Sequence, residues 1–109
     1  MYIPKHFNVT DKEEILSFLK ANTFGQLISL VEGKLFSSHI PLFLSDHNQS
    51  LICHIAKNNP QWECITEQEV LVTFQGPHDY VSPSWYNSPG VPTWNYQSVH
   101  IYGKPQLLT

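Results

Sequence analysis

A capping motif followed by apolar residues at helical spacing marks the first element of the chain. In the stretch TDKE at 10–13, Thr10 can cap a helix while Glu13 lies three residues further on, as in a capping box. The apolar residues that follow recur at the spacing of one helix face, namely Ile15, Leu16, Phe18 and Leu19. This pattern predicts an amphipathic helix over residues 11–21.

Short β-rich runs separated by turn residues fill most of the remaining chain. Asn59 followed by Pro60 has the form of a helix cap with proline at the first helical position, which predicts a short helix through Trp62 and Ile65. The predicted strands are 24–31, 34–44, 51–55, 70–74, 79–82 and 96–102, with the beginning of a seventh at 106–108. Short antiparallel strands with two helices predict a single, mainly β domain over residues 1–109, built as a closed or half-closed barrel.

The polar turn at 45–50 allows the second and third predicted strands to be set against each other. If this turn joins them directly, Leu44 faces Leu51, and counting back along the strands places Ser38 opposite Lys57. Hydroxyl groups and an ammonium group would then converge where the third strand runs into the second helix.

This convergence has the composition of a phosphate-binding site. Ser37 and Ser38 supply hydroxyls, Lys57 supplies a positive charge, and Asn58 and Asn59 lead into the free N–H groups of a helix start. The competing interpretation is an ordinary solvated lysine beside an ordinary helix cap, and the spacing alone favours that interpretation.

The charge of the chain argues against one class of partner. The formal net charge is −3, and all six basic residues are lysines. Proteins that read DNA directly usually rely on arginine and on a basic face. We therefore expect no direct DNA binding by this segment.

The sequence also suggests a location and a redox state. No run of eighteen apolar residues occurs, and the start of the chain lacks the apolar core of a signal peptide. Cys53 and Cys64 do not form a CxxC pair. A cytoplasmic protein with two reduced thiols is expected.

Residues 76–96 combine flat rings with prolines. The segment holds five of the fourteen aromatic residues and four of the eight prolines. Proline disfavours a helix interior or a central strand, so a loop that covers a planar ligand is one interpretation. The competing interpretation places the tryptophans in a core or in a dimer contact.

Several long motifs resemble the PaiB family of FMN-binding proteins, which is similar to the wider flavin-binding split-barrel group. The motifs are MYIPKHF at the start, SSHIPL (37–42), HIAKNNPQW (54–62), FQGPHDYVSPSWY (74–86) and VPTWNYQSVHIYG (91–103). The resemblance implies a six-stranded antiparallel split β-barrel, a homodimer and FMN near the dimer interface.

The resemblance also implies which residues hold FMN. Its phosphate would meet the convergence of Ser38 and Lys57, its ring would lie near His39 and Ile40, and aromatic side chains would cover the ring. The full set of expected cofactor-binding residues is Ser37, Ser38, His39, Ile40, His54, Lys57, Asn58, Trp85, Tyr86 and Trp94.

Three function classes follow. The resemblance favours a regulatory protein, described in the family as a negative transcriptional regulator, over an enzyme. The alternative is a flavin-dependent oxidoreductase related to pyridoxamine phosphate oxidases, and turnover of NAD(P)H would identify it. A flavin-free structural dimer is the third class. No catalytic residue and no metal site is expected, because no HxH, HExxH or GxSxG motif occurs.

The chain departs from the family pattern in places. Asp79 stands where a small residue is usual, and its negative charge would oppose an anionic ligand. Cys53 and Asn58 replace the usual glycine and alanine. Family members generally continue beyond this length, so the chain is expected to be either a fragment lacking a C-terminal part or a short member.

Overall fold

The computed structural model describes residues 1–3, 5, 8–81 and 93–108, and it describes the side chains of these residues except in 78–81 and 93–95. The elements in chain order are α1 (Lys12–Ala21), β1 (Phe24–Val31), β2 (Lys34–Pro41), β3 (Phe43–Leu44), β4 (Leu51–Ile52), η2 (Pro60–Trp62), η3 (Ile65–Glu67), β5 (Val70–Val81) and β6 (Thr93–Gly103). The two elements labelled η are single 3₁₀ turns.

The predicted first helix is confirmed, with a different cap. Asp11, not Thr10, is the N-cap, and its carboxylate accepts a hydrogen bond from the N–H of Glu13 at 3.0 Å. A negative charge at a helix N-terminus interacts favourably with the helix dipole, which a neutral threonine hydroxyl does not match. The apolar side of α1 buries Leu19 and places Ile15 and Phe18 against the core.

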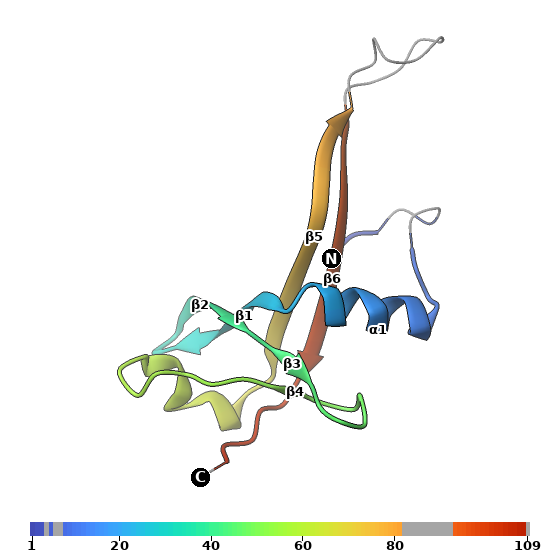
Figure 1. Ribbon diagram of the computed structural model, residues 1–109. Coiled ribbons are helices and arrows are strands. Elements are labelled where there is room, and N and C mark those ends of the chain that lie inside the picture. Colours follow the sequence, from blue (N-terminus) through green and yellow to red (C-terminus); the bar gives the residue numbers. More distant parts are fainter. Residues whose placement is uncertain (4, 6–7, 82–92, 109) are drawn as a thin grey trace, which may run out of the picture.

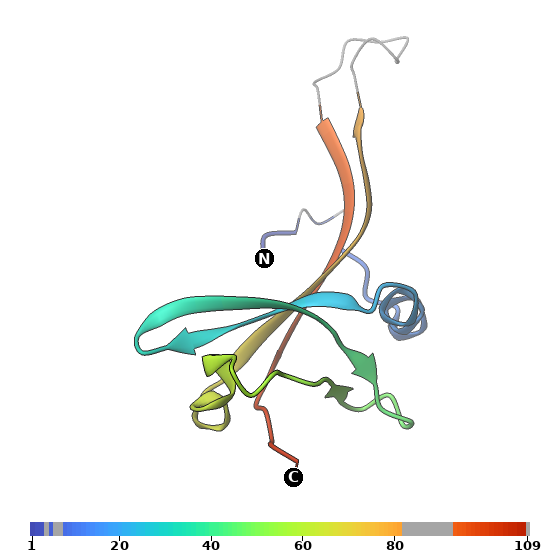
Figure 2. The same cartoon turned by 60° about the vertical axis from the view of Figure 1, so that its left-hand side comes forward.

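Four strands form one antiparallel sheet in the order β2-β1-β5-β6, and β3 and β4 form a second, two-stranded sheet. In both views, α1 lies at the opposite end of the molecule from the β1–β2 turn (Figures 1 and 2). The prediction of a mainly β fold with antiparallel strands and short helices is confirmed. In the described part of the chain the two sheets do not close into a barrel.

The predicted strand 34–44 is divided at Leu42. The N–H of Leu42 donates to the carbonyl of Thr23 at 2.8 Å, and its side chain is buried. The chain then leaves the large sheet, and Phe43 and Leu44 pair with β4. The predicted register Leu44 opposite Leu51 is confirmed. However, β4 ends at Ile52, so the longer pairing that would place Ser38 opposite Lys57 does not form.

The strands β5 and β6 form a hairpin that extends well beyond the other strands (Figure 1). Two strands were predicted at 70–74 and 79–82, yet β5 runs without interruption from Val70 to Val81. A register shift between Gln75 and His78 absorbs the Gly76–Pro77 pair. Proline and glycine are tolerated at such bulges, which is why these turn residues do not end the strand. The predicted strand at 106–108 does not form.

The core lies on one face of the four-stranded sheet. Alternate residues point to it from each strand, and α1 and the 3₁₀ turns cover it. The buried apolar residues are Leu19, Leu27, Leu42, Ile65, Val70, Val72 and Phe74. Gly25 is closely packed at this face, because an added Cβ would lie 2.7 Å from the carbonyl oxygen of Thr73.

The opposite face of this sheet, which we call the open face, carries large exposed side chains. Leu35 is 79% exposed, Phe24 is 63% exposed and Tyr102 is 59% exposed. The molecule is also less compact than a typical domain, since its radius of gyration is 17.0 Å where about 13 Å is expected for this length. The exposed area is 8708 Å² where about 6,200 Å² is typical of this mass. The exposed side chains of the open face and the projecting hairpin both contribute to this extended shape.

None of the helices that the structure describes has the length and apolar character needed to span a membrane.

Candidate functional site

A buried glutamine joins the first 3₁₀ turn to the large sheet. Gln61 is 1% exposed. Its Nε2 donates to the carbonyl of Leu27 and to Oγ of Ser29, both at 2.8 Å, and to the carbonyl of Phe36 at 3.3 Å. Its Oε1 accepts a hydrogen bond from Oγ of Ser38 at 2.6 Å. The amide thereby gives buried partners to the hydroxyls of Ser29 and Ser38, which lie on the core side of β1 and β2.

Asn59 completes this network at the start of the turn. Its Nδ2 donates to Oγ of Ser38 at 2.8 Å, and its Oδ1 accepts from the N–H of Gln61 at 3.0 Å. Ser38 and the segment around residue 59 therefore meet, through side-chain hydrogen bonds in place of strand pairing. The sequence predicted that Ser38 and this segment lie together. It did not identify Gln61, which is hydrogen-bonded to both Ser38 and Asn59.

The network changes what each predicted phosphate ligand can offer. The hydroxyl of Ser38 lies inside it, and the first N–H group of the 3₁₀ turn is already capped by Asn59. Lys57 and Asn58 are exposed just before the turn. The indole Nε1 of Trp62 donates to the carbonyl of Lys57 at 2.9 Å, which fixes the backbone beneath the lysine. An exposed ammonium group on an anchored backbone can donate hydrogen bonds to a phosphate. Lys57 and Asn58 therefore fit a phosphate group.

The edge of β2 presents backbone groups as well as side chains. Because the N–H of Leu42 bonds to Thr23, the alternation of antiparallel pairing turns the backbone groups of Pro41, His39 and Ser37 outward. Pro41 therefore lies where a missing N–H costs nothing. The side chains of Ser37 and His39 belong to the open face. Ile40 packs against the core from the other face, with its backbone directed to β1.

A row of four polar residues crosses the open face, one from each strand. His39 pairs with Gln26, Gln26 with Thr73, and Thr73 with His100, so the four are direct cross-strand neighbours. We call this set the polar row. Oγ1 of Thr73 donates to Oε1 of Gln26 at 3.2 Å. The ring of His39 stacks on that of Phe24, with 6.4 Å between centroids and 24° between planes.

His100 ends the polar row with an unsatisfied nitrogen. Its Nδ1 is enclosed and has no hydrogen-bond partner in the described part of the chain. Burial lowers the pKa of His100, and the positive charge of the N-terminal amino group lowers it further. The imidazole is therefore neutral at pH 7, with one nitrogen that donates and one that accepts.

Three members of the polar row, namely Gln26, Thr73 and His100, are not among the residues that the sequence predicted. A signal existed in the run 24–31, where Gln26 interrupts an otherwise apolar side of the alternation. The pairing of that residue with the others depends on the strand register, which the sequence does not display.

Cys53 and His54 follow β4 and lie outside any strand. His54 is exposed, and its predicted contact with the cofactor stays a prediction. Cys53 is half-buried, and burial raises the pKa of its thiol. A thiol kept protonated is a weak nucleophile, so this residue has no feature of a catalytic cysteine.

The predicted aromatic cover lies outside what the structure describes. Trp85 and Tyr86 fall in the segment 82–92, and the side chain of Trp94 is also outside the described part. The backbone of Trp94 is placed, because this residue pairs with Tyr80 in the projecting hairpin. The contacts of all three rings stay predictions.

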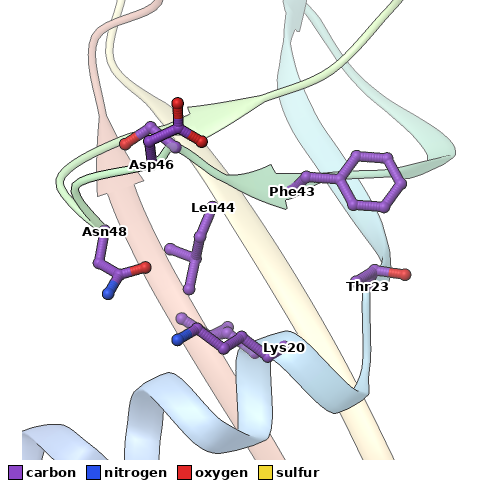
Figure 3. Close-up of a pocket in the computed structure, with 8 residues that line it drawn as sticks. Lys20, Thr23, Phe43, Leu44, Asp46 and Asn48 are labelled. Atoms are coloured by element: carbon purple, nitrogen blue, oxygen red, sulfur yellow. The ribbon is translucent and has the colours of Figure 1, made fainter.

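A separate hollow of about 330 Å³ lies between the end of α1 and the β3–β4 turn (Figure 3). Lys20 borders it from the helix, Asp46 and Asn48 border it from the turn, and Leu44 points between them. None of the predicted cofactor ligands lines it. Its volume is at the lower limit for ligand pockets, and we assign it no role.

Comparison with known proteins agrees with a flavin-related family. A family model described as "Putative FMN-binding domain" matches residues 1–109. The chain is 48% identical over 99% of its length to "Protease synthase and sporulation protein PAI 2" (PaiB) of Bacillus subtilis. It is 29% identical over 99% of its length to the uncharacterized protein YKL070W of Saccharomyces cerevisiae, covering 79% of that protein. It is 34% identical over 82% of its length to the uncharacterized protein AN0679 of Emericella nidulans, covering 49% of it.

The chain spans about half the length of the Bacillus subtilis relative, covering 54% of it.

Proposed function

The chain belongs to the family of FMN-binding domains, and from this premise we propose that it binds FMN at the edge of β2. The phosphate would pair with the ammonium group of Lys57, with Asn58 and Ser37 as further hydrogen-bond donors. The ring would lie on the open face beside His39. The observation that carries this proposal is the position of Lys57. It lies two residues before Asn59, whose side chain donates to Ser38 of β2.

The remaining predicted ligands take supporting roles in this proposal. Ser38 holds the segment around Asn59 in place, Ile40 supports β2 from the core, and the exposed His54 would contact the flavin from the segment that precedes Lys57. When bound, FMN can supply one- and two-electron redox chemistry, and the residues named here would position and orient it.

We further propose that two copies of the chain pair through their open faces, giving the homodimer of split barrels that the resemblance implies. The excess exposed area of a single copy, with Leu35 and Tyr102 on the open face, supports pairing. A stable interface typically removes about 800 Å² from each partner, which this excess can supply. The hairpin of one copy would then bring Trp85, Tyr86 and Trp94 toward the flavin of the other, where flat rings suit a planar ligand.

Light scattering is expected to give the mass of a dimer at micromolar concentration. Leu35→Glu, which places a charge on the open face, is expected to shift the mass toward that of a monomer. Leu108→Glu is the matched control, because Leu108 is equally exposed, at 86% against 79% for Leu35, but lies beyond the strands. A monomer mass for the unchanged protein across this range would contradict the proposed dimer.

We propose a regulatory role in the cytoplasm, which the resemblance to the PaiB family favours and with which the free thiols of Cys53 and Cys64 are consistent. The FMN-loaded protein is expected to oxidise NADH or NADPH no faster than free FMN does. Following the loss of nicotinamide absorbance under anaerobic conditions tests this. A clear excess over free FMN would favour the flavin-dependent oxidoreductase instead.

A further inference from the structure

Lys57 lies in a stretch of chain without regular structure. Strand β4 ends at Ile52 and the 3₁₀ turn η2 begins at Pro60, so the segment between them belongs to no helix or strand. A backbone hydrogen bond closes the turn at Lys57, from the N–H of Asn59 to the carbonyl of Ala56 at 2.9 Å. Ordering an exposed segment costs conformational entropy, so further contacts determine how well the position of the lysine is defined.

The indole of Trp62 holds this turn from the other end. Its Nε1 donates to the carbonyl of Lys57, five residues earlier, at 2.9 Å. An indole carries one N–H donor and no acceptor, so this bond uses its full hydrogen-bonding capacity. Trp62 is 36% exposed, which means that most of its surface is covered and that rotation of the ring is restricted.

Trp62 is itself fixed relative to the large sheet. It follows Gln61 directly in η2, and the buried amide of Gln61 is hydrogen-bonded to groups of both β1 and β2. The main chain of Lys57 is therefore tied to the sheet through the indole as well as through Asn59. It has a defined place beside β2, although the lysine side chain is exposed.

We propose that Trp62 is a positioning residue for the FMN phosphate and contributes to a preference of the site for FMN over riboflavin. The inference rests on the proposed contact between Lys57 and the phosphate. Because the indole N–H holds the carbonyl of Lys57, fewer main-chain conformations are lost when the ammonium group binds an anion. In this role Trp62 acts through the backbone of Lys57 and needs no contact with the flavin.

The test removes the indole N–H while it retains an aromatic ring. Trp62→Phe does this with a smaller ring, and benzothienylalanine at position 62 does it with the same ring shape, because sulfur takes the place of the N–H. Each is expected to bind FMN about fivefold more weakly than the unchanged protein, the effect of one hydrogen bond of ordinary strength. Riboflavin, which lacks the phosphate, is expected to bind with unaltered affinity. Titrations followed by flavin fluorescence give these affinities, and circular dichroism melting verifies the fold.

Gln68→Ala is the matched control. The side-chain Nε2 of Gln68 also donates to a backbone carbonyl a few residues earlier, that of Cys64 at 3.4 Å, and this bond is likewise exposed. It spans η3 and does not involve Lys57. The variant is expected to retain both flavin affinities.

A double-mutant cycle determines whether Trp62 acts through the lysine. Lys57→Ala removes the ammonium group but keeps the carbonyl that the indole holds. In the Lys57→Ala protein, Trp62→Phe is expected to cause no further loss of FMN affinity, because no ammonium group is left to position.

The possible results distinguish the positioning role from FMN binding itself. Equal weakening of FMN and riboflavin, or losses that multiply in the double variant, would overturn the positioning role while leaving FMN binding intact. Unaltered FMN affinity of the folded protein with benzothienylalanine at position 62 would overturn it as well. Failure of the unchanged protein to bind either flavin would overturn the proposed function, and the inference with it.

Discussion

Gln61→Ala is expected to lower the free energy of unfolding by about 3 kcal/mol or more. The substitution leaves the hydroxyl of Ser29 enclosed without a hydrogen-bond partner among the described residues, and it removes one of the two partners of the Ser38 hydroxyl. Each such group costs about 1–3 kcal/mol, and the removed side chain also leaves a cavity. A domain of this size is usually stable by only about 5–15 kcal/mol, so the effect is a large part of the total. Urea unfolding followed by circular dichroism measures it.

Gln68→Ala is the matched control for this prediction. Gln68 also bonds through its side-chain amide to both backbone groups of Leu30, at 2.8 Å each, but these bonds are exposed. Water can replace them, so the expected loss is below about 1 kcal/mol. Equal stability losses in the two variants would show that burial does not make the hydrogen bonds of Gln61 more stabilising than the exposed bonds of Gln68. The same buried network fixes Asn59, so Gln61→Ala is also expected to weaken FMN binding.

Lys57→Ala is expected to weaken FMN binding by about 1–3 kcal/mol, or about 5- to 150-fold, the usual scale for a hydrogen bond to a charged group. Riboflavin lacks the phosphate, and its affinity is expected to change little. Titration of each flavin, followed by fluorescence, gives the two affinities for the variant and the unchanged protein.

Lys12→Ala removes the same charge from the first turn of α1 and is the control for net charge. It is expected to leave both affinities unaltered at moderate ionic strength, because exposed charges more than about 10 Å apart are screened. If Lys57→Ala weakened riboflavin as much as FMN, the lysine would act through folding or packing. That result would contradict the proposed contact between Lys57 and the FMN phosphate.

Local patterns were sufficient where one segment determines its own structure. The amphipathic spacing of 11–21 predicted α1, and the run FGQLISLV predicted β1 with its bounds. The turn at 45–50 also fixed the register of Leu44 and Leu51, because its length alone determines which residues face each other. These predictions needed no knowledge of distant contacts.

Predictions failed where contacts with a distant segment determine the local structure. Gly76 and Pro77 have the character of turn residues, yet pairing with β6 carries β5 through them as a bulge. Ser29 and Ser38 lie on the core side of their strands, which implies a buried polar partner, but nothing local identifies Gln61 as that partner. The polar row likewise exists only once four strands are in register. The structure therefore brings Ser38 and the segment around Asn59 together, while the role of the predicted cofactor-binding residues stays a prediction.

The measurement that tests the central claim most directly is a titration of FMN into the purified, flavin-free protein, read by flavin fluorescence and by absorbance after removal of unbound ligand. We expect saturable binding of one FMN for each chain, with riboflavin bound more weakly because it lacks the phosphate. A fluorescence signal equal to that of free FMN at every protein concentration, with no flavin retained by the protein, would contradict it.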